Sequence, residues 1–299
     1  MPVAQTSAVG WSLASTRLRE SSSVFVENRI GKVYRPMDEP PKIAIAFFGI
    51  IRSLKDTLHS IQSNVIAPCE DKGVTVSVAH LFDTRRIEND RTKENVEVDP
   101  EEFKLLELDQ VELTNSHSDD ILDVLEAAKK FGDFWEDDFQ SLSNLVHQLY
   151  SLRRVTQMVL QANADVAVYC RPDIRYHDSI RSGLQSALSA REDQVLLPYW
   201  QRHKGGLNDR FAICRGEQAI RAYGFRLDAA LAFCEATGQP LHAERLLRYS
   251  LERASIPTSR LDVEGSRVRA NGRVEEEDFK IRRWKTFRNY VRYRRSLRS

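Results

Sequence analysis

The residues best suited to chemistry follow a short apolar run in the middle of the chain. Arg171, Pro172 and Asp173 come directly after residues 166–170, whose β-forming side chains predict a buried strand. Ligands of open α/β sheets bind at the carboxyl ends of strands, so Asp173 is placed to hold a divalent cation, Mn²⁺ or Mg²⁺, that bridges two phosphates. Arg171 could neutralise a phosphate, or the two side chains could simply pair and cap a turn.

A second polar group stands at a glycine-rich turn. Asn208, Asp209 and Arg210 follow the pair Gly205-Gly206 and lead into another short apolar run. Glycines let backbone and ligand approach closely, so the three polar side chains are expected at the mouth of a ligand crevice. Asp209 could act as a general base towards a hydroxyl group, or it could pair internally with Arg210.

A third candidate is the turn after the first apolar run, residues 42–48. Phe48 and Gly49 close this run, and Arg52 and Ser53 follow before a helical pattern begins. A strand, a glycine turn and a helix N-terminus together favour an anion site, with Ser53 as the helix cap and Arg52 facing a diphosphate. The alternative is an ordinary connection between a strand and a helix.

Three further residues carry weaker signals. His203 and His242 are lone histidines, which are more often structural than metal-binding, although His203 is a second candidate metal ligand beside Asp173. Glu244 lies on a predicted helix and faces either the site or solvent. We include it with Asp173 and Asp209 as a candidate catalytic carboxylate.

The elements that must position these residues alternate along the chain. Strands are predicted at residues 42–48, 74–81, 110–114, 166–170, 194–199 and 211–214. Helices are predicted at residues 54–65, 118–130, 142–162, 179–190, 216–223, 227–236 and 241–253. This alternation predicts an α/β protein with a mostly parallel central sheet flanked by helices. Residues 83–107 are expected to form a surface excursion, and residues 255–273 an irregular segment.

Composition and breaks in the pattern set the domain organisation. A chain of 299 residues with 41% hydrophobic residues can form a sizeable core. Four widely spaced cysteines show no CxxC pair, which favours buried free thiols. We predict a loosely ordered N-terminal arm at residues 1–40, a single catalytic domain at 41–279 and a basic amphipathic helix at 280–299.

The C-terminal segment differs from the rest of the chain in charge. Residues 280–299 hold nine Lys and Arg and no acid, whereas residues 1–279 hold 35 basic and 43 acidic residues. Ile281, Trp284, Phe287 and Tyr290 recur at helical spacing, so this segment could contact an anionic membrane surface or dock on the parent domain.

The sequence also indicates a location and a class of partner. No apolar stretch approaches the roughly 20 residues that cross a bilayer, and the first residues lack the pattern of a secretory signal. We therefore expect a cytoplasmic protein, with peripheral attachment to the membrane through residues 280–299. Aromatic residues do not interleave with basic ones on a predicted sheet face, so a nucleic-acid partner is not expected.

Several of these elements together resemble a known family. Phe48-Gly49-x-x-Arg52-Ser53, Arg171-Pro-Asp-Ile and Gly206-Leu-Asn-Asp-Arg-Phe-Ala212, followed by Glu244-x-x-Leu247, are similar to GT-A-type bacterial and viral glycosyltransferase-like proteins over residues 42–254. The resemblance implies a GT-A-like, Rossmann-like fold with a helical C-terminal region, which binds a nucleotide sugar at the first strand-to-helix turn. Arg171 stands where such enzymes place the first Asp of an Asp-x-Asp metal motif, so it could carry part of the cation's role.

The expected function is transfer of a sugar, a hexose or a related one, from a nucleotide-sugar donor to a glycan or lipid-linked acceptor. Asp209 is the candidate base. Asp173→Asn and Asp209→Asn preserve shape and remove only the carboxylate charge, so each is expected to abolish most transfer and leave the fold intact. Nucleotide-binding residues are Phe48, Gly49, Arg52, Ser53, Arg171, Asn208 and Arg210, and the cation ligands are Asp173 and His203. The alternative is a non-catalytic nucleotide- or carbohydrate-binding protein of the same fold.

Overall fold

The computed structural model describes residues 39–89, 93–115, 119–280 and 283–297. Pro40–Ser299 form one compact unit. The predicted arm at residues 1–40 lies almost entirely outside the described residues, so its structure is not considered further.

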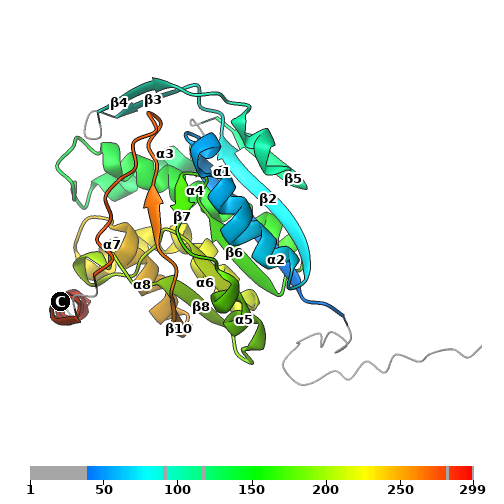
Figure 1. Ribbon diagram of the computed structural model, residues 1–299. Helices are drawn as coiled ribbons and strands as arrows, with labels where there is room; N and C mark the ends of the chain where they lie inside the picture. Colours follow the sequence, from blue (N-terminus) through cyan, green and yellow to red (C-terminus); the bar gives the residue numbers. More distant parts are fainter. Residues whose placement is uncertain (1–38, 90–92, 116–118, 281–282, 298–299) are drawn as a thin grey trace, which may run out of the picture. The chain divides into compact units, whose positions relative to one another are not determined.

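A seven-stranded mixed sheet forms the centre of this unit (Figure 1). Its order is β10 (Thr258–Leu261), β8 (Gln194–Pro198), β9 (Ala212–Arg215), β6 (Val166–Cys170), β1 (Lys42–Ile50), β2 (Val74–Phe82) and β5 (Gln110–Thr114). β9 runs antiparallel to both of its neighbours, and the other neighbouring strands pair in parallel. The predicted α/β class with a mostly parallel sheet is confirmed.

Helices cover both faces of the sheet because the central strands are apolar on both sides. In β1, Ile43, Ile45 and Phe47 face one core cluster, and Ala44 and Ala46 face the other. The first cluster includes residues of α1 (Leu54–Ile61), a π-helical turn (Gln62–Ile66), α2 (Ala67–Glu70) and α5 (Arg181–Ser189). The second includes residues of α4 (Gln140–Gln161), α6 (Glu217–Gly224) and α8 (Ala243–Arg253).

A third core cluster joins the remaining helices and forms the predicted helical C-terminal region. It includes residues of α3 (Asp119–Lys129), α4, the turn η4 (Arg226–Ala229), α7 (Ala230–Thr237), α8 and α9 (Arg283–Ser296). Tyr293 of α9 is 1% exposed, and Tyr290 packs against the same cluster, so this part of the predicted aromatic stripe docks on the domain. Phe287 is instead 61% exposed. The side chains of Ile281 and Trp284 lie outside the described residues.

Two segments expected to lack regular structure contain strands. Residues 83–107 include the antiparallel pair β3 (Arg86–Asn89) and β4 (Glu94–Glu97), followed by η2 (Glu102–Leu106). Residues 255–273 supply β10 at one sheet edge and β11 (Gly265–Arg267), which pairs with β7 (Ile174–Tyr176). These strands are short and polar, so pairing with a neighbour, which local sequence does not encode, decides their conformation.

Other sequence predictions agree closely with the structure. The strands at residues 110–114 and 166–170 have the predicted bounds, and Cys69, Cys170, Cys214 and Cys234 are buried and free. Within the part of the chain that the structure describes, no helix is both long enough and apolar enough to span a membrane.

Candidate functional site

The predicted site residues come together at one edge of the sheet. β1 and β6 pair in parallel, so the turns that follow them lie at the same edge. β9 runs antiparallel to β6, with Ala212 opposite Tyr169, which places residues 208–211 at this edge as well. Asp209 is consequently close enough to Arg171 for its charge to act on the guanidinium group.

Two arginines hold the carboxylate of Asp173. Arg171 donates from Nε to Oδ1 and from Nη2 to Oδ2, both at 3.0 Å. Arg52 donates to Oδ2 from Nε at 3.1 Å and also from Nη2. Burial alone would raise the pKa of Asp173, but the positive charges of Arg171 and Arg52 outweigh it and hold this pKa well below its usual range. The group is therefore a buried, ionised centre of an ion-pair network.

These surroundings do not fit a divalent cation. Both oxygens of Asp173 already accept guanidinium hydrogen bonds, so a cation would enter a region of positive charge. His203, the other predicted ligand, lies in the turn η3 (His203–Gly205), where its charge acts on His242. Residues 39–89, 93–115, 119–280 and 283–297 contain no group of three or more His, Cys, Asp or Glu side chains arranged to hold a metal.

Three hydrogen bonds connect the turn after β6 with residues 53 and 57 and with residue 268. Thr57 Oγ1 donates to the carbonyl of Pro172 at 2.6 Å, and the Val268 amide donates to the carbonyl of Asp173 at 2.8 Å. Ser53 stands at the N-cap of α1, but its hydroxyl donates to the carbonyl of Val268 at 2.9 Å and caps nothing. The predicted N-cap position of Ser53 is confirmed, but its side chain makes no capping hydrogen bond and instead secures the site.

The turn at Gly49 is less open to a ligand than the sequence indicates. Its amide donates to Ser151 Oγ at 2.8 Å, and that hydroxyl donates to the carbonyl of His80 at 2.6 Å. A φ of +103° explains why glycine is needed there. Phe48 is 1% exposed and packs edge to face on Tyr169, with ring centroids 6.5 Å apart, so it belongs to the core.

The loop before β9 is held by Asn208. Its Nδ2 donates to the carbonyl of Trp200 and its Oδ1 accepts the amide of Arg210, both at 2.9 Å. Because Asn208 is 1% exposed, its side chain shapes the loop rather than facing a ligand. Arg210 donates to Gln201 at 2.5 Å, and its Nη1 lies 3.3 Å from Oε1 of Glu277.

The glycine pair allows α8 and α9 to pack against this loop. A Cβ at Gly206 would lie 2.2 Å from the carbonyl carbon of Glu244, and one at Gly205 would lie 2.5 Å from the carbonyl oxygen of Asn289. The Leu207 amide donates to the Glu244 carbonyl at 2.9 Å. The close backbone approach predicted at this glycine pair is therefore made by α8 and α9, and the contact with α8 brings Glu244 to the site.

Glu244 and Asp209 form a pair of neighbouring carboxyl groups. The side chain of Glu244 is 17% exposed. Burial and the negative charge of Asp209 raise the pKa of Glu244 to about 8, against the opposing charges of Arg210 and Arg267. Glu244 is therefore protonated at neutral pH and can donate a hydrogen bond.

His242 lies next to Glu244 in an aromatic environment. Burial and the nearby charge of Arg245 lower the pKa of His242 to about 3, so its ring is neutral. Its Nδ1 lies 3.2 Å from Oε2 of Glu244 without hydrogen-bond alignment. The ring stacks on Trp135 at 5.7 Å and meets Phe134 edge to face at 4.4 Å. This packing agrees with a structural histidine.

Two arginines that the sequence did not single out complete the cluster. Arg226 is fully buried, donates from Nη1 to the carbonyl of Tyr223 at 2.8 Å and places Nη2 4.0 Å from Oδ2 of Asp209. Its Nε and Nη2, Nε of Arg267 and Nη1 of Arg210 are buried and make no hydrogen bond. Three of these nitrogens face a carboxylate without hydrogen-bond alignment: Nη1 of Arg210 and Nε of Arg267 lie 3.3 and 3.6 Å from Oε1 of Glu277, and Nη2 of Arg226 lies near Asp209. Buried donors are almost always bonded, so an anionic ligand could complete the hydrogen bonds that these carboxylates leave unmade.

Arg267 reaches the site through strand pairing. β11 places it opposite Ile174, next to Asp173. Burial and the charges of Arg210 and Arg171 lower the pKa of Arg267 to about 9, against the attraction of Glu277. Its segment is polar and was predicted to be irregular, so no local signal identified it.

Replacing Glu244 by glutamine is expected to reduce the loss of stability that the protein shows as pH rises. A pKa of about 8 in the folded protein, against 4.5 for an ordinary glutamic acid, means that the folded state binds more protons between these values. The free energy of unfolding contributed by Glu244 therefore falls as pH rises through this window. Urea unfolding at about pH 6 and about pH 9 should show a smaller difference for Glu244→Gln than for the parent protein.

The matched control is Glu217→Gln on α6, since the side chain of Glu217 is 66% exposed. This variant should keep the parent's dependence on pH. If Glu244→Gln also keeps it, the raised pKa of Glu244 is wrong.

Comparison with known proteins gives one structural likeness and no match by sequence. No protein-family model and no curated protein matches the sequence. Among solved structures, the chain is similar to mouse xyloside xylosyltransferase 1 in its apo form, with a TM-score of 0.41 and 12% sequence identity over 74% of this chain and 85% of the mouse chain.

Proposed function

We propose that the protein is a glycosyltransferase that transfers a sugar from a nucleotide-sugar donor to a glycan or lipid-linked acceptor. The observation that carries the proposal is the set of buried guanidinium nitrogens without hydrogen bonds beside the carboxyl pair of Asp209 and Glu244. The cluster lies at the carboxyl edge of the parallel strands, where α/β sheets bind their ligands.

The guanidinium groups suit the diphosphate of such a donor. The charges of Arg171 and Arg210 both act on Arg267, and Arg226 lies 4.0 Å from the carboxylate of Asp209. Negative charge grows on the diphosphate as the sugar leaves, and fixed cationic donors in a dry site stabilise that charge most effectively. Asp173 positions Arg171 and Arg52 for this role.

The carboxyl pair supplies the proton chemistry. We assign Asp209 as the base that accepts the proton of the acceptor hydroxyl as this oxygen attacks the anomeric carbon. Glu244, protonated at neutral pH, donates a hydrogen bond to the bound donor. No step is assigned to a divalent cation, because guanidinium groups occupy both oxygens of its expected ligand, Asp173.

The same observation about Asp173 favours one alternative function. A carboxylate saturated by arginines also suits a protein that binds a nucleotide or a carbohydrate and catalyses nothing. The two functions differ in turnover: the rival would bind a nucleotide sugar and release no nucleoside diphosphate when acceptors are added.

A panel of nucleotide sugars is therefore the deciding measurement. One donor is expected to raise the melting temperature with or without EDTA, and at about 100 times its dissociation constant the stabilisation should be about 2.7 kcal/mol. Arg267→Gln should weaken binding of that donor by roughly ten- to a hundredfold, as expected for loss of one charge-assisted contact. The unliganded variant is compared with the parent by urea unfolding, because Arg267 lies not only among other arginines but also 3.6 Å from the buried carboxylate of Glu277.

Arg221→Gln provides the control, since Arg221 is exposed on α6 and pairs with Glu217. It should bind the donor as the parent does. If no nucleotide sugar stabilises the parent protein, or if both variants bind equally well, the proposed donor site is wrong.

A further inference from the structure

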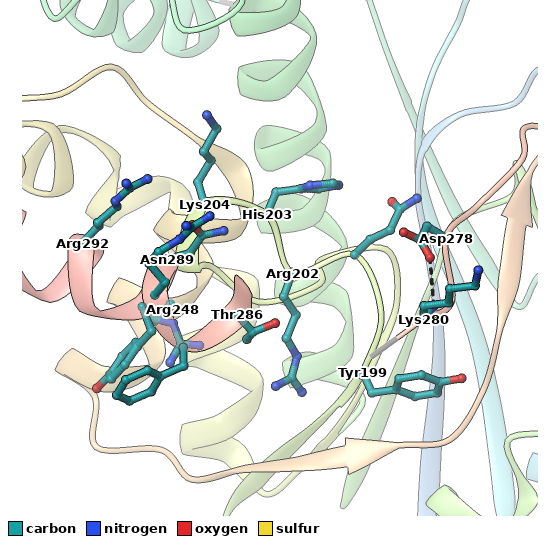
Figure 2. Close-up of a pocket in the computed structure, with 14 residues that line it drawn as sticks. Tyr199, Arg202, His203, Lys204, Arg248, Asp278, Lys280, Thr286, Asn289 and Arg292 are labelled. Carbon is teal, nitrogen blue, oxygen red and sulfur yellow. Dashed lines mark hydrogen bonds between the residues drawn. The ribbon is translucent and has the colours of Figure 1, made fainter. Parts of the chain in front are cut away.

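A second basic region lies outside the carboxyl cluster. A cavity of about 740 Å³ is lined by residues from the segment 199–204, from α8, from the segment 278–280 and from α9. Figure 2 shows their side chains. Among its fourteen described lining residues, six are lysine or arginine: Arg202, Lys204, Arg248, Lys280, Arg288 and Arg292. Asp278 is the single carboxylate among them, and neither Asp209 nor Glu244 lines the cavity.

The positive charges outnumber the acids there, although Arg248 also pairs with Glu252, outside the lining, at 3.3 Å. The carboxylate of Asp278 accepts the backbone amide of Lys280 at 3.1 Å. Burial and the charges of Arg248 and Arg260 lower the pKa of Arg202, and its Nε is buried without a hydrogen bond. Like charges held this close repel one another, so a bound anion would stabilise the arrangement.

The walls of the cavity are fixed by packing. Arg248 donates from Nε to the carbonyl of Gly205 at 2.6 Å, which ties α8 to the loop. Because residue 205 is a glycine, the backbone of α9 at Asn289 can approach the loop closely. Tyr293 anchors the same helix in the core. The cationic side chains are thus held on a preformed frame, which lowers the entropy lost on binding.

The lining also defines the class of ligand. Arginine and lysine are the side chains that recognise phosphate, and a volume of this size accommodates a small organic molecule. Tyr199, Tyr290 and the 61% exposed Phe287 add apolar surface beside the cations. The ligand is therefore expected to join an anionic group to an apolar or ring-shaped one.

We propose that this cavity binds a phosphate or diphosphate group, either on a free molecule or as the head group of a lipid. The cavity adjoins the proposed donor site through Gln201, whose Oε1 accepts a hydrogen bond from Arg210, but the proposal does not depend on that function.

The test compares two double variants of the full-length protein. Lys280→Gln/Arg292→Gln removes two exposed cations from the cavity, and Arg294→Gln/Arg295→Gln removes two exposed cations of α9 that do not line it. Each double variant loses two positive charges, and each leaves the residues of the proposed donor site unchanged. Binding of inorganic diphosphate is measured by calorimetry, and binding to phosphatidylcholine vesicles with and without phosphatidic acid by co-sedimentation, for both variants and the parent.

The cavity variant is expected to lose about tenfold or more in affinity for at least one probe, while the control variant stays within about threefold of the parent. If the cavity variant loses affinity for inorganic diphosphate, a free phosphate group is sufficient for binding. If it loses affinity only for vesicles with phosphatidic acid, the ligand is a lipid head group. Failure of the parent to bind either probe, or equal effects of the two variants, would overturn the proposal. The proposed donor site is tested separately, by the effect of Arg267→Gln on binding of the nucleotide sugar.

Discussion

Replacing Asp173 by asparagine is expected to lower the free energy of unfolding by about 3 to 5 kcal/mol, the usual cost of breaking a buried ion pair from one side. The carboxylate of Asp173 is 3% exposed and accepts hydrogen bonds from Arg52 and Arg171. Asparagine has nearly the same shape but no charge, so two guanidinium groups would lose their counter-ion inside the protein. The sequence by itself predicted an intact fold for this variant, and the buried network changes that expectation.

Urea unfolding at neutral pH measures this effect, and Asp71→Asn is its control. Asp71 also pairs with an arginine, Arg181, but the two side chains are 53% and 52% exposed. Loss of an exposed pair typically costs less than about 1 kcal/mol. If Asp173→Asn is no more destabilising than Asp71→Asn, the network around Asp173 does not stabilise the fold.

Acid should destabilise the parent protein for the same reason, because protonation removes the charge of Asp173. Arg171 and Arg52 hold the pKa of Asp173 below 3.8, its ordinary value. The stability that this group contributes is therefore complete above that value and is lost as pH falls further. The loss should be absent in Asp173→Asn, which has no carboxylate to protonate.

Replacing Asp209 by asparagine is expected to lower kcat by roughly a hundred- to ten-thousandfold, the range typical of a lost general base. Asp209 is 8% exposed, next to Arg226 and the protonated Glu244. Asparagine preserves shape but accepts no proton from the acceptor. Affinity for the donor should change little, because the guanidinium groups remain. Steady-state kinetics with the donor found in the nucleotide-sugar panel measure both quantities.

Two comparisons make this prediction specific. Asp228→Asn, which alters an exposed aspartate paired with Arg153, should leave kcat unchanged. Because the charge of Asp209 helps to raise the pKa of Glu244, the Asp209→Asn variant should also bring this pKa down. Normal transfer by Asp209→Asn would exclude Asp209 as the base.

The sequence by itself determined the sheet strands that carry the site and most of the residues that meet there. Apolar runs such as residues 166–170 depend on local composition, and the polar residues after them must lie at a strand end. For this reason Arg171, Asp173 and Asp209 could be named as candidates before any coordinates, whereas the helical position of Glu244 left its direction open. The glycine pair at residues 205–206 likewise indicated a close backbone approach.

The tertiary structure alone decided what these residues touch. Arg52 and Asp173 are 121 positions apart, and no local pattern predicts that they bond. The antiparallel direction of β9 brings Asp209 to the edge, and the pairing of β11 brings Arg267. Burial and neighbouring charge, which set the protonation of Glu244, exist only in the folded chain. The basic cavity has the same origin, because packing of α9 against the loop gathers cations that are distant in the sequence.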